Sequence, residues 1–273
     1  MAINRETIAA GAATRWRLPA QRMLGIPIGV DSLDSLLESV SHAVQTSAGP
    51  FTVACANPHS LVVAQQDETF RCALQSCSAV VADGAGVTFA ARVLRVEVGP
   101  RITGTDFFLG TMRQLDRIGG KAFFLGSVNP VLQLVKERVA RDFPRVTVET
   151  LSPPFGTWSA EQQAEVMQRI RAAQADVLWV GMTAPKQEKW MHAHAEECGV
   201  PVVGAIGAVF DYYAGTVRRA PQWICRLGFE WLYRLLGEPQ RLWRRTLISG
   251  PQFAWLLLRE RLQAGGHREA SAG

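Results

Sequence analysis

The chain has 273 residues and a net charge of +5, with 48% hydrophobic and 19% charged residues. This length suits one large domain, or a domain with an appendage, and leaves room for a sizeable core. No apolar run approaches the roughly 18 residues that a membrane-spanning helix needs, and residues 1–20 lack the apolar segment of a signal peptide. Five cysteines without a Cys-x-x-Cys pair favour reduced thiols in the cytoplasm. We expect residues 1–20 to be a disordered tail.

The positive charge is concentrated near the C-terminus. Between Val217 and Arg245 there are seven arginines and two glutamates, so this segment has a net charge of +5, which equals the net charge of the whole chain. The rest of the chain is therefore near neutral, and the basic segment needs an anionic partner or another reason. Tryptophans lie among these arginines, a mixture that nucleic-acid binders also use, but no recognisable nucleic-acid fold accompanies them. We expect no nucleic-acid partner.

Apolar runs that end at Gly, Asn or Asp alternate with helical segments along the chain. The predicted strands are 23–29, 51–56, 79–82, 121–125, 146–149, 177–180 and 201–206. The clearest predicted helices are one capped by Asp31 and those over 61–76, 107–117 and 130–142. Strands alternating with helices of about 10 to 15 residues are typical of βαβ units. We therefore predict an α/β fold with a mainly parallel sheet, whose strand order stays open.

Asp83 directly follows the predicted strand 79–82 and precedes Gly84 and Gly86. Its carboxylate is a candidate general base in a crevice at the end of that strand. An Asp that caps the next helix is the more common reason for a lone Asp-Gly. Gly84-x-Gly86 also resembles a dinucleotide-binding turn that lacks its third glycine, so an NAD-type oxidoreductase is an alternative.

Other polar residues also stand where predicted strands end. Asn57 and Asp211 are candidate ligand contacts or ordinary turn residues. Arg101 could bind a phosphate or solvate a loop. Gln187 and Glu188 could hydrogen-bond sugar hydroxyls, although an exposed helix start also favours them. Because parallel strands place their carboxyl ends at one edge of the sheet, we expect these residues to converge on one crevice.

Motifs for several metal and phosphate chemistries are missing. The sequence has no Asp-x-Asp, no Gly-x4-Gly-Lys-Ser/Thr loop and no Gly-x-Ser-x-Gly elbow. His192 and His194 lie two residues apart on a predicted helix, so they face different ways and make a poor zinc pair. We expect no metal site and no cofactor.

After Gly215 the pattern becomes helical and amphipathic. The segment 221–236 places tryptophans and leucines on one helical face, and 253–258 is a second apolar stretch beside arginines. Such a pattern is typical of a helix in a membrane interface, while helices packed on the body remain an equal alternative. We expect a body over 21–215, a helical, arginine-rich appendage over 216–262 and a disordered tail over 263–273.

The motifs form an ordered set: Asn57-Pro58, Ala82-Asp83-Gly84-x-Gly86, Arg101-x-x-Gly104-x-Asp106, Phe124-Leu-Gly126, Gly181-x-x-x-Pro185-Lys-Gln-Glu188, Gly207-x-x-Phe210-Asp211, Arg219-Ala-Pro221 and Glu230-Trp231-x-x-Arg234-Leu235-x-x-Glu238-Pro239-x-Arg241. This set resembles the WecG/TagA/CpsF glycosyltransferases (glycosyltransferase family 26), over roughly residues 22–248. The resemblance implies a Rossmann-like body and a C-terminal appendage that docks on the membrane and completes the site.

The resemblance also implies inverting, metal-independent sugar transfer from a UDP-sugar to a polyprenyl-diphosphate-linked saccharide. The reaction would take place at the inner face of a bacterial plasma membrane, on an anionic surface, in the synthesis of exopolysaccharide or another cell-envelope polymer. The donor would be UDP-N-acetylmannosamine-like or a UDP-hexose, with UDP-glucose and UDP-glucuronate as alternatives. A non-catalytic scaffold on the membrane surface is a further alternative, and a homo-oligomer stays open.

Site residues follow from the resemblance position by position. Asp83 is the implied base. The implied donor- and acceptor-binding residues are Cys55, Asn57, Gly84, Gly86, Arg101, Gly126, Gly181, Gln187, Glu188 and Asp211. The implied diphosphate- or membrane-binding residues are Arg234, Arg241 and Arg244. Cys55 stands where much of the family has Thr, which removes a hydroxyl contact and is compatible with a different sugar.

Overall fold

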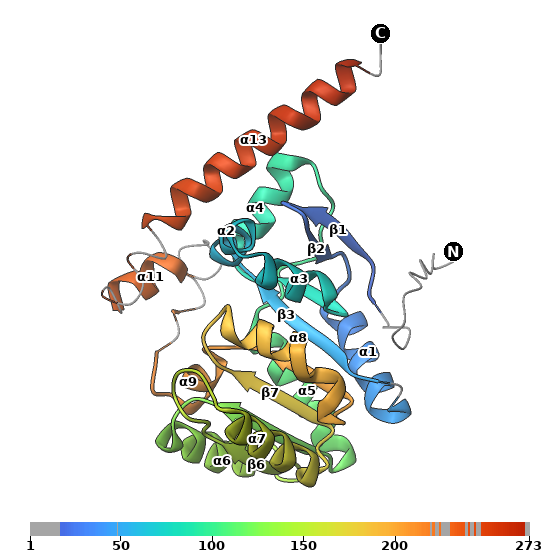
Figure 1. Ribbon diagram of the computed structural model, residues 1–273, viewed down its shortest axis with the longest axis vertical. Coiled ribbons are helices and arrows are strands. Elements are labelled where there is room, and N and C mark those ends of the chain that lie inside the picture. The colour runs from blue at the N-terminus through green and yellow to red at the C-terminus, as the bar shows by residue number, and fades with distance from the viewer. Residues whose placement is uncertain are drawn as a thin grey trace.

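The computed structural model describes residues 17–47, 49–218, 220, 221, 224, 230–237, 240, 243 and 247–270, apart from the side chains of 230, 234 and 264–270. A parallel sheet of six strands lies between helices on both faces (Figure 1). The strands are β3 (Phe51–Ala56), β4 (Ala79–Ala82), β5 (Lys121–Gly126), β6 (Thr147–Leu151), β7 (Val177–Gly181) and β8 (Val202–Ala205). Every neighbouring pair is parallel, which confirms the predicted fold class.

The helices divide between the two faces of the sheet. The described helices are α1 (Leu33–Thr46), α2 (Pro58–Gln66), α3 (Glu68–Ser76), α4 (Ala85–Leu94), α5 (Gly104–Ile118), α6 (Asn129–Asp142), α7 (Ala160–Ala173), α8 (Lys186–Cys198), α9 (Val209–Ala214), α11 (Glu230–Gly237) and α13 (Ser249–Ala270). Buried side chains of α2, α3, α4, α7, α8 and α13 form the core on one face. Those of α1, α5, α6 and α9 form the core on the other, around Trp179 of β7.

The strand order is β4-β3-β8-β7-β5-β6, so the last strand of the chain, β8, lies between β3 and β7. The register pairs Ala54 of β3 with Ala205 of β8, and Val180 of β7 with that same residue from the other side. The carboxyl ends of β4, β3, β8 and β7 are therefore neighbours. Polar residues that follow these four strands share one edge of the sheet, as parallel pairing requires.

The opening segment is a hairpin, not the single strand predicted over 23–29. Strands β1 (Ala20–Met23) and β2 (Ile26–Gly29) pair in antiparallel fashion around a turn at Leu24 and Gly25. Both turn residues have positive φ, 50° and 76°, as a tight hairpin turn requires. The tail predicted over 1–20 is also too long, because the Leu18 amide donates to the Ser78 carbonyl at 2.9 Å; residues 1–16 lie outside the described part.

Two helix boundaries differ from the prediction because capping side chains set them. The helix predicted over 61–76 is split at Asp67, whose carboxylate accepts a hydrogen bond from the Phe70 amide and so starts α3. Helix α1 is capped by Ser32, which accepts from the Ser35 amide at 3.2 Å, and not by Asp31.

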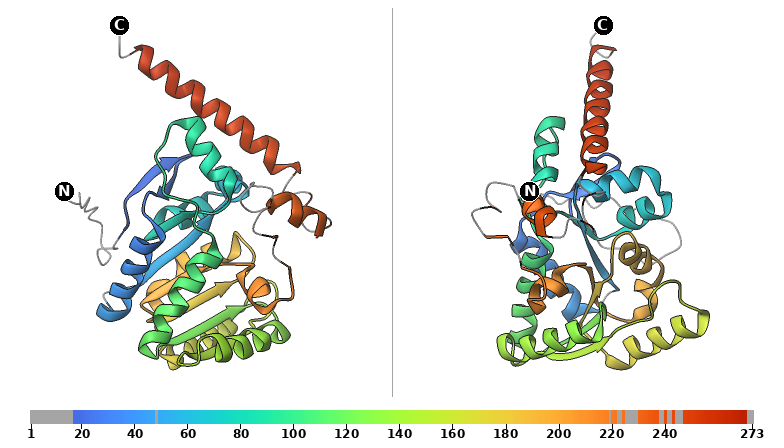
Figure 2. Two further views of the ribbon diagram at one scale, coloured as in Figure 1. Left: turned by 180° about the vertical axis from the view of Figure 1, so that it is seen from behind. Right: turned by 90° about the vertical axis from the view of Figure 1, so that its left-hand side faces the viewer.

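The C-terminal helix α13 lies across α2 and α4 (Figures 1 and 2). Its Phe253 and Leu257 are buried in the core of that face. Its Glu260 carboxylate accepts from the Leu24 amide at 3.1 and 3.2 Å, which ties the helix to the hairpin turn. The helix continues past 262, where we expected a disordered tail, to Ala270. No helix in the described part is both long and apolar enough to span a membrane.

Candidate functional site

Asp83 lies at the shared edge, immediately after β4. Its amide donates to the Ala56 carbonyl at 2.8 Å, which ties the end of β4 to the end of β3. The N-cap of α4 is Gly84, with φ of 93°, and no side chain caps this helix. The capping interpretation of Asp83 is therefore wrong, and the residue stands at the end of β4, the position that we expected for a general base.

Cys55 of β3 lies within the electrostatic influence of several acidic side chains. Its thiol is half-buried, and burial is the main reason that its pKa is raised well above the usual value. The negative charges of Asp83, Glu188 and Asp106 raise that pKa further. A Cβ placed on Gly104 would lie 3.4 Å from the Cys55 sulfur. The Gly104 approach places the start of α5 against the end of β3, and the strand order places the ends of β4 and β8 on either side of it.

Asn57 follows β3 and serves as the N-cap of α2. Its Oδ1 accepts from the Ser60 amide at 3.1 Å, and its own amide donates to the Ser60 hydroxyl at 3.4 Å, which completes a capping box. Asn57 thus has a local structural role, as a helix cap rather than as a turn residue. Because Oδ1 is engaged in the cap, the Asn57 side-chain amide nitrogen is the atom that a ligand could use.

Arg101 lies in the segment before α5. It borders a groove of about 590 Å³ between α4 and residues 96–101, together with Arg92 and Thr88. Small-molecule pockets measure about 300 to 1,000 Å³, so the groove has a suitable size. The next residue, Ile102, donates its amide to the Ala82 carbonyl at 3.1 Å. Arg101 is therefore close along the chain to the strand end that carries Asp83, although Asp83 does not line this groove.

Sequence reasoning missed the role of Asp106, which is both a helix cap and a neighbour of Cys55. Its Oδ2 accepts from the Thr103 amide at 3.0 Å and from the Thr103 hydroxyl at 2.6 Å. The capping-box spacing Thr103-x-x-Asp106 is the signal that could have found it. The cap fixes the start of α5, and with it the position of Gly104 against the Cys55 sulfur.

Gln187 and Glu188 lie in the first turn of α8, and both are buried, with 5% and 1% of their surface exposed. The alternative of an exposed helix start is therefore wrong. The Gln187 Nε2 donates to the Glu188 Oε1 at 2.8 Å. A Cβ on Gly207, which follows β8, would lie 3.4 Å from the Gln187 Oε1, so this amide also reaches the common edge.

Three of the predicted site glycines allow close packing that a side chain would prevent. A Cβ on Gly126 would lie 2.4 Å from the Gly181 carbonyl oxygen, and a Cβ on Gly181 would lie 2.6 Å from the Phe210 ring. A Cβ on Gly86 would lie 2.5 Å from Pro58 Cγ, so this glycine serves the contact between α4 and α2 rather than a dinucleotide turn. At Gly84 a Cβ would meet nothing within 4 Å, which leaves open space beside Asp83.

The remaining predicted residues lie at the periphery of the site or outside the described part. Asp211 is half-buried in the first turn of α9, the helix whose Val209 lies against Gly104. Arg234 lies on α11, but its side chain is not described. Arg241 and Arg244, like Arg219 of the Arg-Ala-Pro motif, lie outside the described residues.

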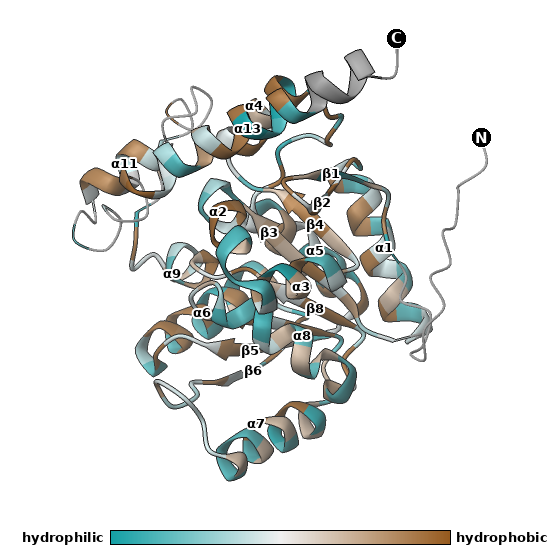
Figure 3. Cartoon of the chain, turned by 45° about the horizontal axis from the view of Figure 1, so that its top comes forward, coloured by the Kyte–Doolittle hydropathy of each residue, from teal (hydrophilic) through white to brown (hydrophobic). Residues whose placement is uncertain are grey.

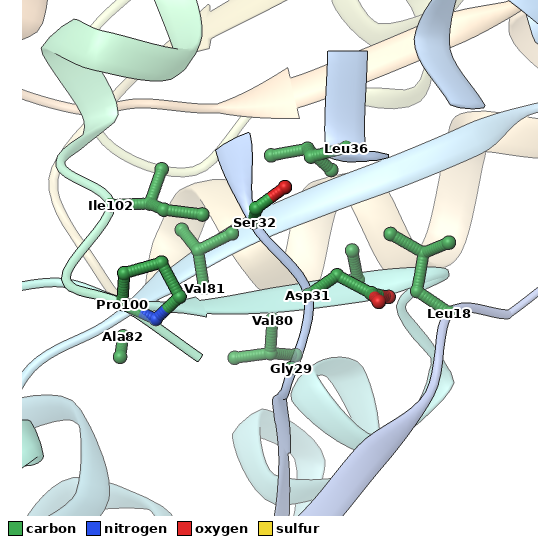
Figure 4. A pocket seen from close by; sticks show the side chains of 11 residues that line it. Leu18, Gly29, Asp31, Ser32, Leu36, Val80, Val81, Ala82, Pro100 and Ile102 are labelled. Atoms are coloured by element: carbon green, nitrogen blue, oxygen red, sulfur yellow. The ribbon is translucent and has the colours of Figure 1, made fainter. Parts of the chain in front are cut away.

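A second, smaller cavity does not serve as the site. It measures about 10 Å³ and is lined mainly by apolar side chains such as Leu36, Val80 and Ile102, with Asp31 at its border (Figure 4). Burial raises the pKa of the Asp31 carboxyl, and its Oδ2 has no hydrogen-bond partner in the described part of the chain. This space holds about one water molecule, so it is too small for a sugar.

Candidate metal ligands do not cluster in the described residues. No three His, Cys, Asp or Glu side chains of this part of the chain group as a metal site would require. His192 of α8 is within hydrogen-bonding distance of the Ser76 hydroxyl, at 2.7 Å from its Nδ1.

The sequence is similar to one family of known proteins over most of its length. The model of the glycosyl transferase WecG/TagA/CpsF family matches residues 21–266. A Bacillus spizizenii (strain W23) protein named N-acetylglucosaminyldiphosphoundecaprenol N-acetyl-beta-D-mannosaminyltransferase is 33% identical over 244 residues, which cover 87% of this chain and 92% of that protein. Proteins of the same name from Bacillus subtilis (strain 168) and Staphylococcus aureus (strain MW2) are 27% and 26% identical, covering 86% and 83% of this chain and 90% and 88% of their own lengths. With the family's sequence pattern over most of its length, the chain belongs to the WecG/TagA/CpsF family of glycosyltransferases.

Proposed function

We propose that this glycosyltransferase moves a sugar from a UDP-sugar to a saccharide linked to polyprenyl diphosphate, in the synthesis of a bacterial cell-surface polysaccharide. The observation that carries the proposal is that Asp83, Cys55 and the Gln187–Glu188 pair all lie at the carboxyl ends of neighbouring parallel strands. The names of the relatives support a polyprenyl-diphosphate acceptor and an N-acetylmannosamine donor. A UDP-hexose, including UDP-glucose or UDP-glucuronate, is the alternative donor.

In this proposal Asp83 takes the proton from the acceptor hydroxyl as that oxygen attacks the anomeric carbon of the donor. UDP leaves from the opposite face of the sugar ring, so the anomeric configuration inverts. The charges of Asp83, Glu188 and Asp106 all raise the pKa of the Cys55 thiol, and we infer that an anionic diphosphate would be repelled from this end of the sheet. We therefore place the diphosphates on the basic groups, at Arg101 and at the C-terminal Arg234, Arg241 and Arg244.

Charge stabilisation by arginines would allow the reaction to proceed without a metal ion. A leaving UDP gains negative charge as the glycosidic bond breaks, and guanidinium groups can stabilise it through bidentate hydrogen bonds. We expect EDTA to leave the transfer rate essentially unchanged. A strict requirement for Mg²⁺ or Mn²⁺ would contradict this part of the proposal.

We further propose that the C-terminal helices hold the protein on the inner face of the membrane. Helix α11 exposes Trp231 (52%) and Leu236 (74%), and α13 exposes Trp255 (64%) and Leu262 (67%). Hydrophobic and hydrophilic segments alternate along both helices (Figure 3). Exposed apolar side chains of this kind insert into a lipid interface, and each nearby arginine adds about 1 kcal/mol of attraction to anionic lipids.

The catalytic proposal is tested with Asp83→Asn. The variant is supplied with a panel of UDP-sugars and a short-chain lipid-diphosphate acceptor, and products are read by mass spectrometry. Because the amide cannot take the acceptor proton, we expect turnover to fall by about 100-fold or more while the fold stays intact. Asp34→Asn, on the exposed start of α1, is the matched control and should keep wild-type activity. Wild-type turnover by Asp83→Asn would refute the role of Asp83.

The membrane proposal is tested with a Trp231→Ser/Leu236→Ser variant and anionic liposomes. Because both side chains are exposed, their loss should not lower the melting temperature, yet each removes up to about 1.5 to 3 kcal/mol of apolar burial in lipid. We expect liposome affinity to fall at least about tenfold. Ile118→Ser is the control, since Ile118 is 59% exposed but ends α5 at the opposite edge of the sheet. Equal liposome binding by both variants would contradict the proposal.

A further inference from the structure

The side chains of Gln187 and Glu188 form a hydrogen bond in which Gln187 is the donor. Both are buried, and the Gln187 Nε2 donates to the Glu188 Oε1 at 2.8 Å. A glutamine amide can face a neighbour with its nitrogen or its oxygen, but a carboxylate accepts hydrogen bonds and has none to donate. Glu188 therefore determines which end of the Gln187 amide faces it, and the amide oxygen must face elsewhere.

The Gln187 Oε1 is a buried acceptor without a protein partner in the described part of the chain. Leaving such an atom unsatisfied is unfavourable in a folded protein, which points to a partner that binds from outside. The amide lies against the backbone at Gly207, where a Cβ would be 3.4 Å from Oε1 and 3.5 Å from Nε2. Gly207 has a φ of 54°, so the end of β8 approaches the amide closely without a side chain between them.

The same pair lies at the same end of the sheet as the proposed base. Strand β3, which carries Cys55, lies between β4, which Asp83 follows, and β8, which Gly207 follows. The Gln187 amide lies against Gly207, and the charges of Glu188 and Asp83 both raise the pKa of the Cys55 thiol, which agrees with this placement. A ligand bound across the carboxyl ends of these strands would therefore meet both Asp83 and the Gln187 amide.

We propose that Glu188 is a positioning residue, which holds Gln187 with its amide oxygen towards the reacting sugar. The site then accepts a hydrogen bond from a sugar hydroxyl or from an N-acetyl N–H, and discriminates against a sugar that lacks this donor. A buried acceptor left unpaired gives strong discrimination of this kind. The inference rests on the proposed function, and the sugar concerned is either the transferred one or the terminal sugar of the acceptor.

The central test is a double-mutant cycle with Glu188→Gln and Gln187→Leu. In Glu188→Gln the new side-chain amide can donate a hydrogen bond to the Gln187 oxygen. The Gln187 amide can then flip, so that its nitrogen instead of its oxygen faces the ligand. We expect KM for one of the sugar substrates to rise about tenfold with little change in kcat, because a hydrogen bond made both before and in the transition state is lost. Gln187→Leu should show at least the same rise. The double variant should be no worse than Gln187→Leu, because Glu188 acts only through Gln187.

A rescue variant separates positioning from a purely structural role. Gln187→Glu/Glu188→Gln exchanges donor and acceptor within the pair and leaves a carboxylate oxygen facing the ligand. We expect its KM to fall most of the way back from the raised value of Glu188→Gln to the wild-type value. Gln133 and Glu137 on α6 form a matched exposed pair, with a hydrogen bond of 2.9 Å. Glu137→Gln should leave KM, kcat and melting temperature unchanged.

Substrate analogues identify the ligand group. Donors and acceptors in which one hydroxyl is replaced by hydrogen are compared in wild type and in Glu188→Gln. The wild type should lose about tenfold or more in kcat/KM on one analogue, and the variant should lose much less. A change confined to donor analogues assigns the transferred sugar, and one confined to acceptor analogues assigns the acceptor. Equal losses in both proteins on every analogue would overturn the inference.

The outcomes separate this inference from the proposed function. If the wild type transfers the sugar and Glu188→Gln has unaltered kinetics, the role of Glu188 is overturned while the proposed function stands. Additive losses in the double variant have the same consequence. Absence of transfer by the wild type from every UDP-sugar overturns the proposed function. In that case the Gln187 side-chain amide is followed by ¹⁵N NMR: a resonance that Glu188→Gln leaves unshifted overturns the orienting role, and a shifted one supports it.

Discussion

Replacing Gly181 with alanine tests whether this glycine serves packing or ligand binding. Gly181 ends β7, and its φ is not positive, so the backbone itself tolerates alanine. A Cβ there would lie 2.6 Å from the Phe210 Cδ2 and Cε2 and 2.7 Å from Cζ. Ordinary carbon–carbon contacts measure about 3.5 to 4.0 Å, so the ring would have to move by roughly 1 Å.

The ring has little freedom to move. Phe210 is 2% exposed, and its ring packs edge-on against Phe124 with centroids 5.3 Å apart. Overpacking a core of this kind costs about 1 to 3 kcal/mol. Since 1 kcal/mol shifts the melting temperature of a protein of this size by about 2 to 4 °C, we expect Gly181→Ala to melt about 2 to 12 °C lower.

Thermal unfolding by circular dichroism, with and without a smaller residue at 210, provides the assay. Phe210→Leu removes the ring edge that the new methyl group would strike, so Gly181→Ala should cost much less in that background. Donor KM should stay at the wild-type value in Gly181→Ala at a temperature where the variant is folded. Additive losses of stability, or an unchanged melting temperature with a raised donor KM, would show that the glycine serves the ligand and that our packing argument is mistaken.

The remaining predictions concern thiols and the docking of α13. Burial raises the Cys198 pKa from 9.0 to about 12, so between those pH values the unfolded chain loses this proton and the folded protein keeps it. Stability should therefore fall with rising pH by about 1.4 kcal/mol per pH unit from this group, and Cys198→Ala should flatten the slope in urea unfolding. Iodoacetamide should modify the exposed Cys72 well before Cys55, whose raised pKa keeps it a thiol, as peptide mass spectrometry of a short reaction would reveal. Phe253→Ala should cost about 3 to 5 kcal/mol in urea unfolding, whereas the exposed Trp255→Ala should cost under about 1 kcal/mol.

The sequence was sufficient to predict the parallel sheet and the position of Asp83 at the carboxyl end of one of its strands. Apolar strands that end at polar residues or glycine are local signals, and parallel pairing brings their ends to one edge whatever the strand order. The order itself depends on contacts between distant segments. That β8 would lie between β3 and β7 therefore could not be inferred from any local pattern.

The missed features have identifiable physical causes. The hairpin turn uses Leu24 at positive φ, where Asn or Gly would have given a recognisable signal. The Leu24 main chain is held there by Glu260 and by Gln65, which donates to its carbonyl at 2.8 Å. These contacts come from 236 and 41 residues further along the chain, beyond the reach of a local pattern.

Burial of Gln187 and Glu188 was equally hidden. Polar residues at a helix start normally face water, and the apolar Trp190 and Met191 that follow them are the only local hint of a core-facing turn. Their burial follows from the central place of β8, which brings Gly207 against the Gln187 amide. The environment of Gln187 and Glu188 thus depends on the strand order, which sequence patterns could not predict.

Helix α13 confirms the interpretation of a helix packed on the body, and its contact with a membrane stays a proposal. One face packs Phe253 and Leu257 over α2 and α4, the helices that start beside Asn57 and Asp83. The other face exposes Trp255 by 64%, and we propose that this face contacts a lipid surface. Deleting this helix would expose core side chains, so a loss of both activity and liposome binding would follow from unfolding alone. Only substitutions on the exposed face separate the two roles. Because that face is fixed rigidly to the site helices, attachment through it would also set the orientation of the site edge towards a membrane-bound acceptor.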